Sequence, residues 1–264
     1  MLEILYRDDY LAAVHKPPGL LVHRTGLDAG ETRFAVQMLR DQIGQPVWPV
    51  HRLDKGTSGV LLFALDAGTA SALGKAFEGG EGLRKTYHAI VRGWPSEQGL
   101  IDHPLKRMPD DMRSQREEVQ DAQTRYRTLE RHTLPLAFGG FNTLRCALVE
   151  LQPLTGRRHQ LRRHMKHIAH PIIGDSTHGK GPLNRAVAGW LGVQRMWLHA
   201  GALTVSHPHT GRPLCIEAPT SPDWGRWGCL PQTEVSTSDP PPDSPASPAR
   251  SARAPGSGCD RNPA

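Results

Sequence analysis

The chain has 264 residues, 38% of them hydrophobic, which is enough for one large domain or two small ones. Its formal net charge of +6 favours a polyanionic partner, with RNA or DNA ahead of a membrane surface. No apolar run approaches the length of a membrane span and no basic-then-apolar signal peptide opens the chain, so we expect a cytoplasmic protein that binds no membrane. Its cysteines are scattered and form no CxxC pair, which argues against a disulfide framework or a zinc motif: Cys146, Cys215, Cys229 and Cys259.

The N-terminal part of the sequence predicts short strands and two helices. Apolar residues at helical spacing indicate helices that end at Gly44 and at Gly79–Gly80. Apolar runs between turn residues predict strands at Leu2–Tyr6 and Tyr10–His15, forming a hairpin, at Leu20–His23 after the Lys16–Gly19 turn, at Val60–Leu65 and at Lys85–Val91.

The C-terminal part predicts further strands at 124–129, 143–151, 196–205 and 214–218, and residues 104–120 form a polar surface insertion. Leu161, Met165 and Ile168 are spaced as the apolar stripe of a helix. The chain has no internal repeat and no regular alternation of strands and helices. We therefore expect an α+β fold, with a mixed, mainly antiparallel sheet and flanking helices.

The end of the chain differs in composition from the rest. From Pro231 onward it is rich in Pro, Ser and Ala and has almost no large apolar residues. Such a segment cannot bury enough surface to offset the entropy of ordering. We predict one folded domain over residues 1–230 and a disordered tail over 231–264.

The most informative stretch is His51–Gly59, in which Asp54 follows the basic pair His51-Arg52 after a single leucine. A Gly/Thr/Ser turn follows, and then the apolar run Val60–Leu65. An aspartate before such a turn is often only a turn former or a helix cap. Here the basic surroundings favour a carboxylate that stays ionised, as a nucleophile or a base requires.

A second dense feature runs from Thr155 to His167 and has no acidic residue before Gly174. The apolar stripe of this helix packs inward, so its Arg and Lys residues face solvent or a cleft. Arginines at a helix N-terminus make a good phosphate site, although a solvated basic face is the simpler alternative.

Several histidines in this region raise the question of a metal site: His159, His164, His167 and His170. No carboxylate or cysteine lies nearby in the sequence, and the surrounding positive charges would repel a cation. We therefore expect no metal.

Tyr87 lies between Lys85 and His88 on a predicted strand. Ordinary core packing explains a strand tyrosine equally well. The functional alternative is an aromatic platform for a nucleic-acid base.

Six segments together resemble the pseudouridine synthases of the RluA type. They occur in the order of that family and cover about residues 1–220, and the His-Arg-Leu-Asp loop followed by Thr-Ser-Gly is the most specific of them. The segments are Lys16–His23, His51–Gly59, Lys85–Gly93, Gly156–Arg162, His170–Asp175 and Leu198–Ala200.

The resemblance implies a cofactor-free isomerase with the catalytic-domain fold of that family. The enzyme would break the glycosidic bond of a uridine, rotate the uracil and rejoin it through C5. Asp54 would be the essential aspartate, Arg157 its ion partner and Tyr87 the ring that stacks on the target base, while Arg52 would fill the gap that the flipped base leaves. The further residues expected to bind RNA are His51, Arg158, Arg162, Arg163 and Lys166.

Within the family the sequence is most similar to the TruC branch, which modifies uridine 65 of tRNA, and we expect a monomer. Two alternatives stay open. One is a synthase of the same family that acts on ribosomal RNA, and the other is a non-catalytic RNA-binding module.

Overall fold

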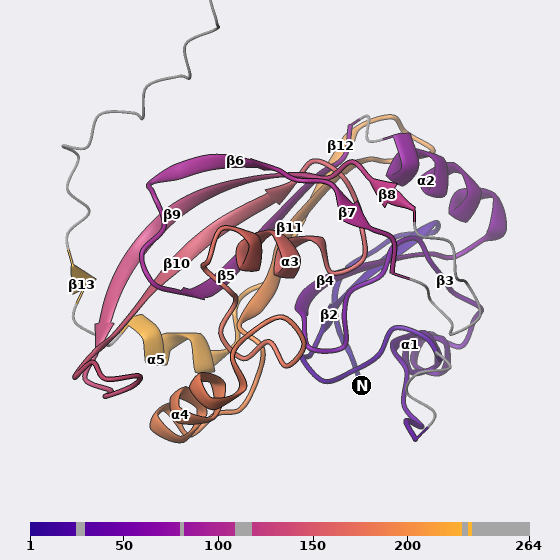
Figure 1. Ribbon diagram of the computed structural model, residues 1–264. Coiled ribbons are helices and arrows are strands. Elements are labelled where there is room, and N and C mark those ends of the chain that lie inside the picture. The colour runs from indigo at the N-terminus through magenta and orange to yellow at the C-terminus, as the bar shows by residue number, and fades with distance from the viewer. Residues whose placement is uncertain (25–29, 80–81, 109–117, 229–231, 234–264) are drawn as a thin grey trace, which may run out of the picture.

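One large sheet organises the protein, as a computed structural model of the chain shows (Figure 1). The structure describes residues 1–24, 30–79, 82–108, 118–228 and 232–233. Almost all of the predicted tail, 231–264, lies outside these residues, so its disorder stays a prediction. Within the described part, eleven strands join in the order β1-β2-β4-β11-β5-β10-β9-β13, with β12, β3 and β6 pairing to β11, β4 and β9.

In chain order the elements are β1 (Glu3–Arg7), β2 (Leu11–Lys16), α1 (Ala35–Ile43), β3 (Trp48–Pro49), β4 (Ser58–Ala64), α2 (Ala67–Gly79), β5 (Arg84–Arg92), β6 (Gln98–Asp102), β7 (Leu105–Lys106), β8 (Val119–Gln120), β9 (Gln123–Leu134), β10 (Leu144–Pro153), α3 (Gln160–His167), α4 (Gly181–Leu191), β11 (Leu198–Ser206), β12 (Pro213–Glu217), the 3-10 helix η1 (Pro222–Trp224), α5 (Gly225–Gly228) and β13 (Gln232–Thr233).

Strand β4 is the central strand of the N-terminal half. Every residue of β4 is buried, because Leu61 and Phe63 pack into one core cluster while Val60 and Leu62 pack into another. A strand covered on both faces is expected to read as a continuous apolar run, as this one does. β4 runs parallel to β11, and the other strand pairings among the described residues are antiparallel. The predicted α+β class, with its mixed and mainly antiparallel sheet, is confirmed.

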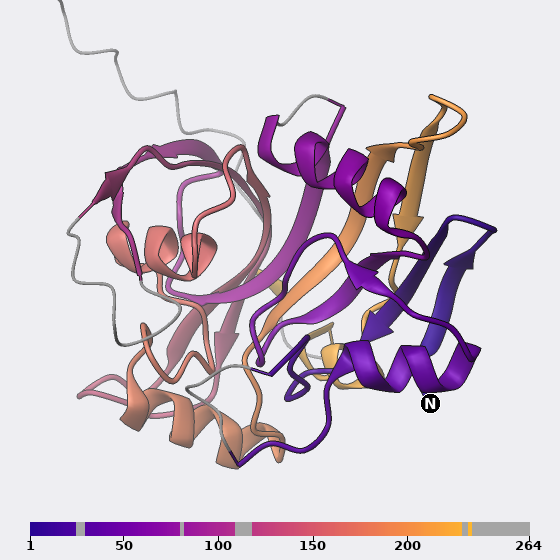
Figure 2. The ribbon, with the colours of Figure 1, turned by 90° about the vertical axis from the view of Figure 1, so that its right-hand side faces the viewer.

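The C-terminal half of the sheet bends around helix α3. In Figure 2 the strands β5, β10 and β9 curl round this helix, which lies on their concave side. Leu161 and Met165, the stripe predicted from sequence, are buried in one cluster with Val91 of β5 and Val149 of β10. This packing fixes the N-terminal end of α3 at the middle of the sheet, close to the start of β4.

Some local predictions differ from the structure. Leu20–His23 forms no strand; Leu21 makes only an isolated bridge to Phe34. Strands β9 and β10 extend beyond the predicted ranges, and helix α4 was not predicted. The apolar spacing of Leu183, Val187 and Leu191, together with a proline in the first turn, is the signal that would have indicated α4.

Residues 104–120 contain the short hairpin β7–β8, and residues 109–117 of the predicted insertion lie outside the described part. Among the described residues, no helix combines the length and the apolar character that a membrane crossing needs.

Candidate active site

The loop that carries Asp54 is held firmly at the start of β4. The carbonyl oxygen of Asp54 accepts the N–H of Thr57 over 3.0 Å, and that of Lys55 accepts the N–H of Gly19 over 2.8 Å. The buried ammonium of Lys16 also donates to the Lys55 carbonyl over 3.2 Å. Burial lowers the pKa of Lys16 to about 7, and the charge of Asp54 acts in the opposite direction. The fold therefore fixes the backbone on which Asp54 is displayed.

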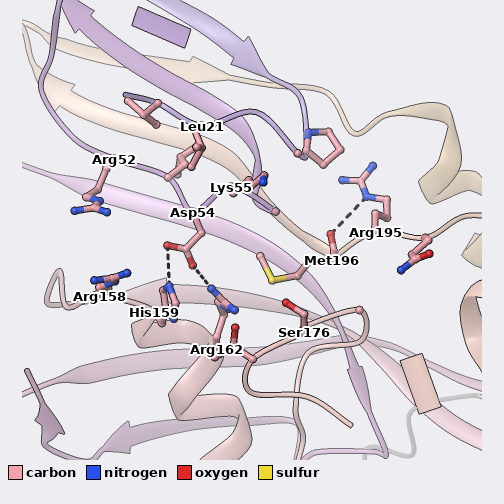
Figure 3. Close-up of a pocket in the computed structure, with 18 of the residues that line it drawn as sticks. Leu21, Arg52, Asp54, Lys55, Arg158, His159, Arg162, Ser176, Arg195 and Met196 are labelled. Atoms are coloured by element: carbon pink, nitrogen blue, oxygen red, sulfur yellow. Dashed lines mark hydrogen bonds and ion pairs between the residues drawn. The ribbon is translucent and has the colours of Figure 1, made fainter. Parts of the chain in front are cut away.

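Asp54 lies between two groups contributed by α3 and its N-terminal turn (Figure 3). Arg162 Nη1 donates to Asp54 Oδ2 over 2.9 Å, and His159 Nε2 lies 3.8 Å from Asp54 Oδ1. The Asp54 side chain is 22% exposed, whereas the Arg162 side chain is only 8% exposed. A partly exposed carboxylate beside a buried guanidinium is available to a substrate and held in one orientation.

The prediction that Arg157 pairs with Asp54 is wrong. Arg157 lies three residues before α3 begins, and its Nε donates to the backbone carbonyl of Asp121 over 3.0 Å. Arg162 lies in the first turn of α3, from which its side chain reaches Asp54. Arg162 was predicted only to bind RNA, so sequence reasoning named the right segment and the wrong arginine.

Arg162 has a second carboxylate partner, Asp175, in the loop between α3 and α4. Arg162 Nε and Nη2 donate to Asp175 Oδ2 and Oδ1, each over 2.7 Å. Burial alone would raise the pKa of Asp175, but the hydrogen bonds and charge of Arg162 outweigh it and the pKa is lowered. Asp175 was not predicted from sequence to be a site residue. The available signal was that it is the first acid after the long basic stretch.

His159 was considered from sequence only as a metal ligand, and its position beside Asp54 was not predicted. Its backbone is left-handed, with φ 54° and ψ 25°, a conformation that costs a non-glycine residue about 1 kcal/mol or more. Its Nδ1 lies 3.0 Å from Nε2 of His178. Burial lowers the pKa of His159 to about 4, so the ring is neutral at pH 7. If His178 donates to Nδ1, the proton of His159 sits on Nε2 and points at Asp54, which is the electrostatically favourable tautomer.

Two cavities meet at Asp54. One has a volume of about 380 Å³ and contains Tyr87 and Lys85 of β5, together with Leu198 of β11. The other has a volume of about 500 Å³ and contains Arg195 and Met196. The residues shared by both walls come from the Asp54 loop and from α3 with its N-terminal turn: Arg52, Leu53, Asp54, Arg158, His159 and Arg162.

Tyr87 lies in the smaller cavity, as a base-stacking role requires. Burial and then the charge of Asp54 raise the pKa of its phenol, so Tyr87 stays neutral at physiological pH. Lys85 lies beside it on β5, and burial lowers the pKa of that ammonium. The cavity therefore offers an aromatic ring, a carboxylate and a nearby amine to a nucleoside.

The other residues predicted to bind RNA lie at the two cavities beside Asp54 or on α3. Arg52 is exposed and lies two residues before Asp54, and both Arg52 and Arg158 line the two cavities. Arg163 donates to the backbone carbonyl of Lys106 over 2.9 Å, which ties α3 to β7, and Lys166 is exposed on α3. A third, smaller hollow is lined mainly by cations: Lys106, Arg107, Arg157, Arg158 and Arg163.

His51 has partners within the fold. Its Nε2 accepts the N–H of Leu62 over 3.0 Å, and its ring stacks on Phe77 at 5.0 Å between centroids. Burial lowers the pKa of His51 to about 3, so the ring is neutral. It lines the Tyr87 cavity, but its polar nitrogen is used to hold the strand that follows Asp54.

In the part of the chain that the structure describes, no group of three or more His, Cys, Asp or Glu side chains is placed to hold a metal ion. The histidines that raised the question of a metal site make separate contacts. His164 faces Thr124 and the His103 carbonyl, His170 faces the Arg92 carbonyl, and His167 stacks on the ring of His103.

Comparison with known proteins identifies the family to which the chain belongs. The model of the RNA pseudouridylate synthase family matches residues 10–167. The chain is 52% identical over 228 residues to tRNA pseudouridine synthase C of Vibrio cholerae, covering 85% of this chain and 93% of that protein. It is 48% identical to the protein of that name from Yersinia pestis, covering 85% and 88%.

Solved structures agree with the sequence comparison. Human RNA pseudouridylate synthase domain containing 1 superposes with a TM-score of 0.67 at 27% identity, covering 89% of this chain and 90% of that one. Human RNA pseudouridylate synthase domain containing 4 gives 0.63 at 28% identity, covering 86% and 93%. By sequence and by fold, the chain belongs to the RNA pseudouridylate synthase family.

Proposed function

We propose that the protein converts a uridine of tRNA to pseudouridine and that Asp54 is its essential catalytic group. The observation that carries this proposal is the placement of Asp54, which is held by Arg162 at the wall of a cavity that also contains Tyr87. A uridine in that cavity would have its ring beside Tyr87 and its ribose beside Asp54.

The proposed reaction is an isomerisation, whose atoms and electrons balance without a cofactor. The bond between N1 of uracil and C1′ of ribose breaks, and a bond between C5 and C1′ forms. C5 loses a proton and N1 gains one, so substrate and product are isomers and nothing is oxidised or reduced. Asp54 acts as a nucleophile or as a base on the ribose, and the hydrogen bond from Arg162 holds its carboxylate in place.

A base inside a duplex cannot reach Asp54, so the target nucleotide must be flipped out at a cost of a few kcal/mol. Stacking on Tyr87 and contacts of arginines with phosphate offset that cost. Arg52 is exposed and lies two residues before Asp54, a position suited to fill the vacated space in the RNA. The remaining cations around the opening are proposed to hold the RNA backbone, and these include Arg157.

The choice of tRNA rests on the relatives, which carry the name tRNA pseudouridine synthase C at 48–52% identity. The choice of uridine 65 rests on the resemblance to the TruC branch. We further propose that the enzyme works as a monomer in the cytoplasm. In support, Asp54, Arg162 and Tyr87 all come from one chain.

Site-resolved mapping of pseudouridine in a strain that lacks the gene, and in the same strain after the gene is restored, tests the assignment. The expected result is the loss and recovery of pseudouridine at position 65 of tRNA, with ribosomal RNA unchanged. Loss at a ribosomal position would support the synthase that acts on ribosomal RNA. If no pseudouridine is lost, and purified protein binds tRNA without converting it, the non-catalytic alternative holds.

A further inference from the structure

Asp175 is a buried carboxylate behind the Asp54 site, and the proposed chemistry does not use it directly. Its side chain is 0% exposed. It follows Gly174 in the loop after α3, and it is not among the residues that line either cavity beside Asp54. Any effect of Asp175 on the reaction must therefore pass through other residues.

The first such residue is Arg162. Asp175 accepts two of its hydrogen bonds, from Nε and from Nη2, in the paired geometry that fixes the guanidinium plane. This leaves Nη1 as the nitrogen that reaches Asp54 over 2.9 Å. Without Asp175, the buried Arg162 would lose the two hydrogen bonds that keep Nη1 in that direction.

The second route runs through the loop that Asp175 begins. Its Oδ1 also accepts the backbone N–H groups of Thr177 and His178, each over 2.9 Å. These bonds fix the position of His178, whose ring contacts His159, and His159 Nε2 faces Asp54. Asp175 thus holds Arg162 directly and His159 through His178, and these are the two side chains beside Asp54.

We propose that Asp175 is a positioning residue for the isomerisation, because it orients Arg162 and the His178–His159 pair against Asp54. This inference rests on the proposed function. It predicts that a change at Asp175 slows the chemical step and leaves the binding of RNA nearly unchanged.

The most informative variant is Asp175→Asn. Asparagine keeps the shape and can keep Oδ1 as the acceptor for Thr177 and His178, while it replaces Oδ2 by an NH₂ group that faces Arg162 Nε. We expect kcat on a tRNA transcript to fall about 10- to 100-fold, since small misplacements of reacting groups have costs of this size. KM for the transcript should change less than about twofold, because no RNA contact is removed.

Asn184→Ala is the matched control for a purely structural effect. Asn184 Nδ2 donates to the backbone carbonyl of Asp175 over 2.8 Å, and its Oδ1 accepts the N–H of Gly174 over 2.9 Å. It braces the same turn without touching Arg162. Asn184→Ala should lower the Tm and keep kcat, whereas Asp175→Asn should lower kcat with a smaller change of Tm. The opposite pattern would overturn the inference.

A double-mutant cycle with Arg162→Lys separates positioning from general damage. If Asp175 acts through Arg162, the effect of Asp175→Asn on kcat is much smaller in the Arg162→Lys background. Two losses that simply multiply would contradict the inference. Wild-type turnover on the same transcript is measured in parallel. Its absence would refute the proposed function, whereas active wild type with equally active Asp175→Asn would refute this inference alone.

Discussion

Arg162 Nη1 donates a hydrogen bond to Asp54 Oδ2 over 2.9 Å, although 108 residues separate the two in the sequence. The contact exists because the bent strands β5, β9 and β10 hold α3 at the middle of the sheet, near the loop that precedes β4. The proposed catalytic carboxylate and its cation are therefore positioned by the two halves of the sheet, and their geometry depends on how these halves join.

Arg162→Gln should lower kcat about 100-fold or more, because Asp54 loses the charged hydrogen-bond donor that orients it. Arg157→Gln should change kcat less than about tenfold, since Arg157 contacts a backbone carbonyl and not Asp54. Single-turnover kinetics at saturating tRNA measure both. A larger loss of kcat in Arg157→Gln than in Arg162→Gln would contradict the assignment of Arg162 as the ion partner of Asp54.

RNA binding should depend steeply on salt, and two cations of α3 should contribute to that dependence. Arg163→Gln or Lys166→Gln should weaken tRNA binding and reduce the slope of log K against log salt by about 1, if each contacts one phosphate. Filter binding at several salt concentrations gives the slope. Arg212→Gln, an exposed arginine between β11 and β12, serves as the control and should leave the slope unchanged. An unchanged slope in the α3 variants would remove this helix from the RNA interface.

Gly59 is required by the parallel pairing of β4 with β11. Its φ is +114°, and a Cβ at this position would collide with the backbone carbonyl of Ala200. Gly59→Ala should lower the free energy of unfolding by about 2–6 kcal/mol, from strained backbone and overpacking together. Gly74→Ala, within α2 and with open space at the Cβ position, should instead stabilise by about 0.5–1 kcal/mol. Urea unfolding measures both, and equal effects would argue against the close approach of the strands.

Acid should destabilise the fold before most carboxylates titrate. Burial lowers the pKa of His159 and of His199 from 6.5 to about 4, so the unfolded chain binds more protons than the folded chain between these values. The stability that these rings contribute is complete above about pH 6.5 and is lost as the pH falls through about 4. Calorimetry should show the Tm falling across this window, and His199→Asn should flatten the fall. A Tm independent of pH from 7 to 4.5 would contradict the burial of these neutral rings.

The sequence predicted the parts of the fold whose signals are local. The apolar run is buried over 60–64, as are Leu161 and Met165 of the predicted stripe, and Gly44 ends α1 in a left-handed conformation. Leu20–His23 was misassigned, because apolar composition alone does not distinguish a strand from an extended segment that packs on the core. Leu21 and Val22 are buried there, but Leu21 pairs only with Phe34.

The candidate site shows the same division between local and long-range information. Asp54 could be selected from its basic neighbours and from the family motif, both of which are continuous in sequence. The choice between Arg157 and Arg162 depends on the direction of each side chain at the start of α3, which spacing does not give. Asp175 and His159 act through contacts that span the loop after α3, so their roles emerge only in three dimensions.

Asp54→Asn is the decisive variant for the proposal that Asp54 carries out uridine isomerisation on RNA. The variant keeps the shape of the side chain and removes its charge. Pseudouridine formed on a tRNA transcript should be readily measurable with wild type and reduced at least about a thousandfold with Asp54→Asn, while tRNA affinity and Tm stay close to wild type. Turnover by Asp54→Asn within about tenfold of wild type would refute the catalytic role of Asp54.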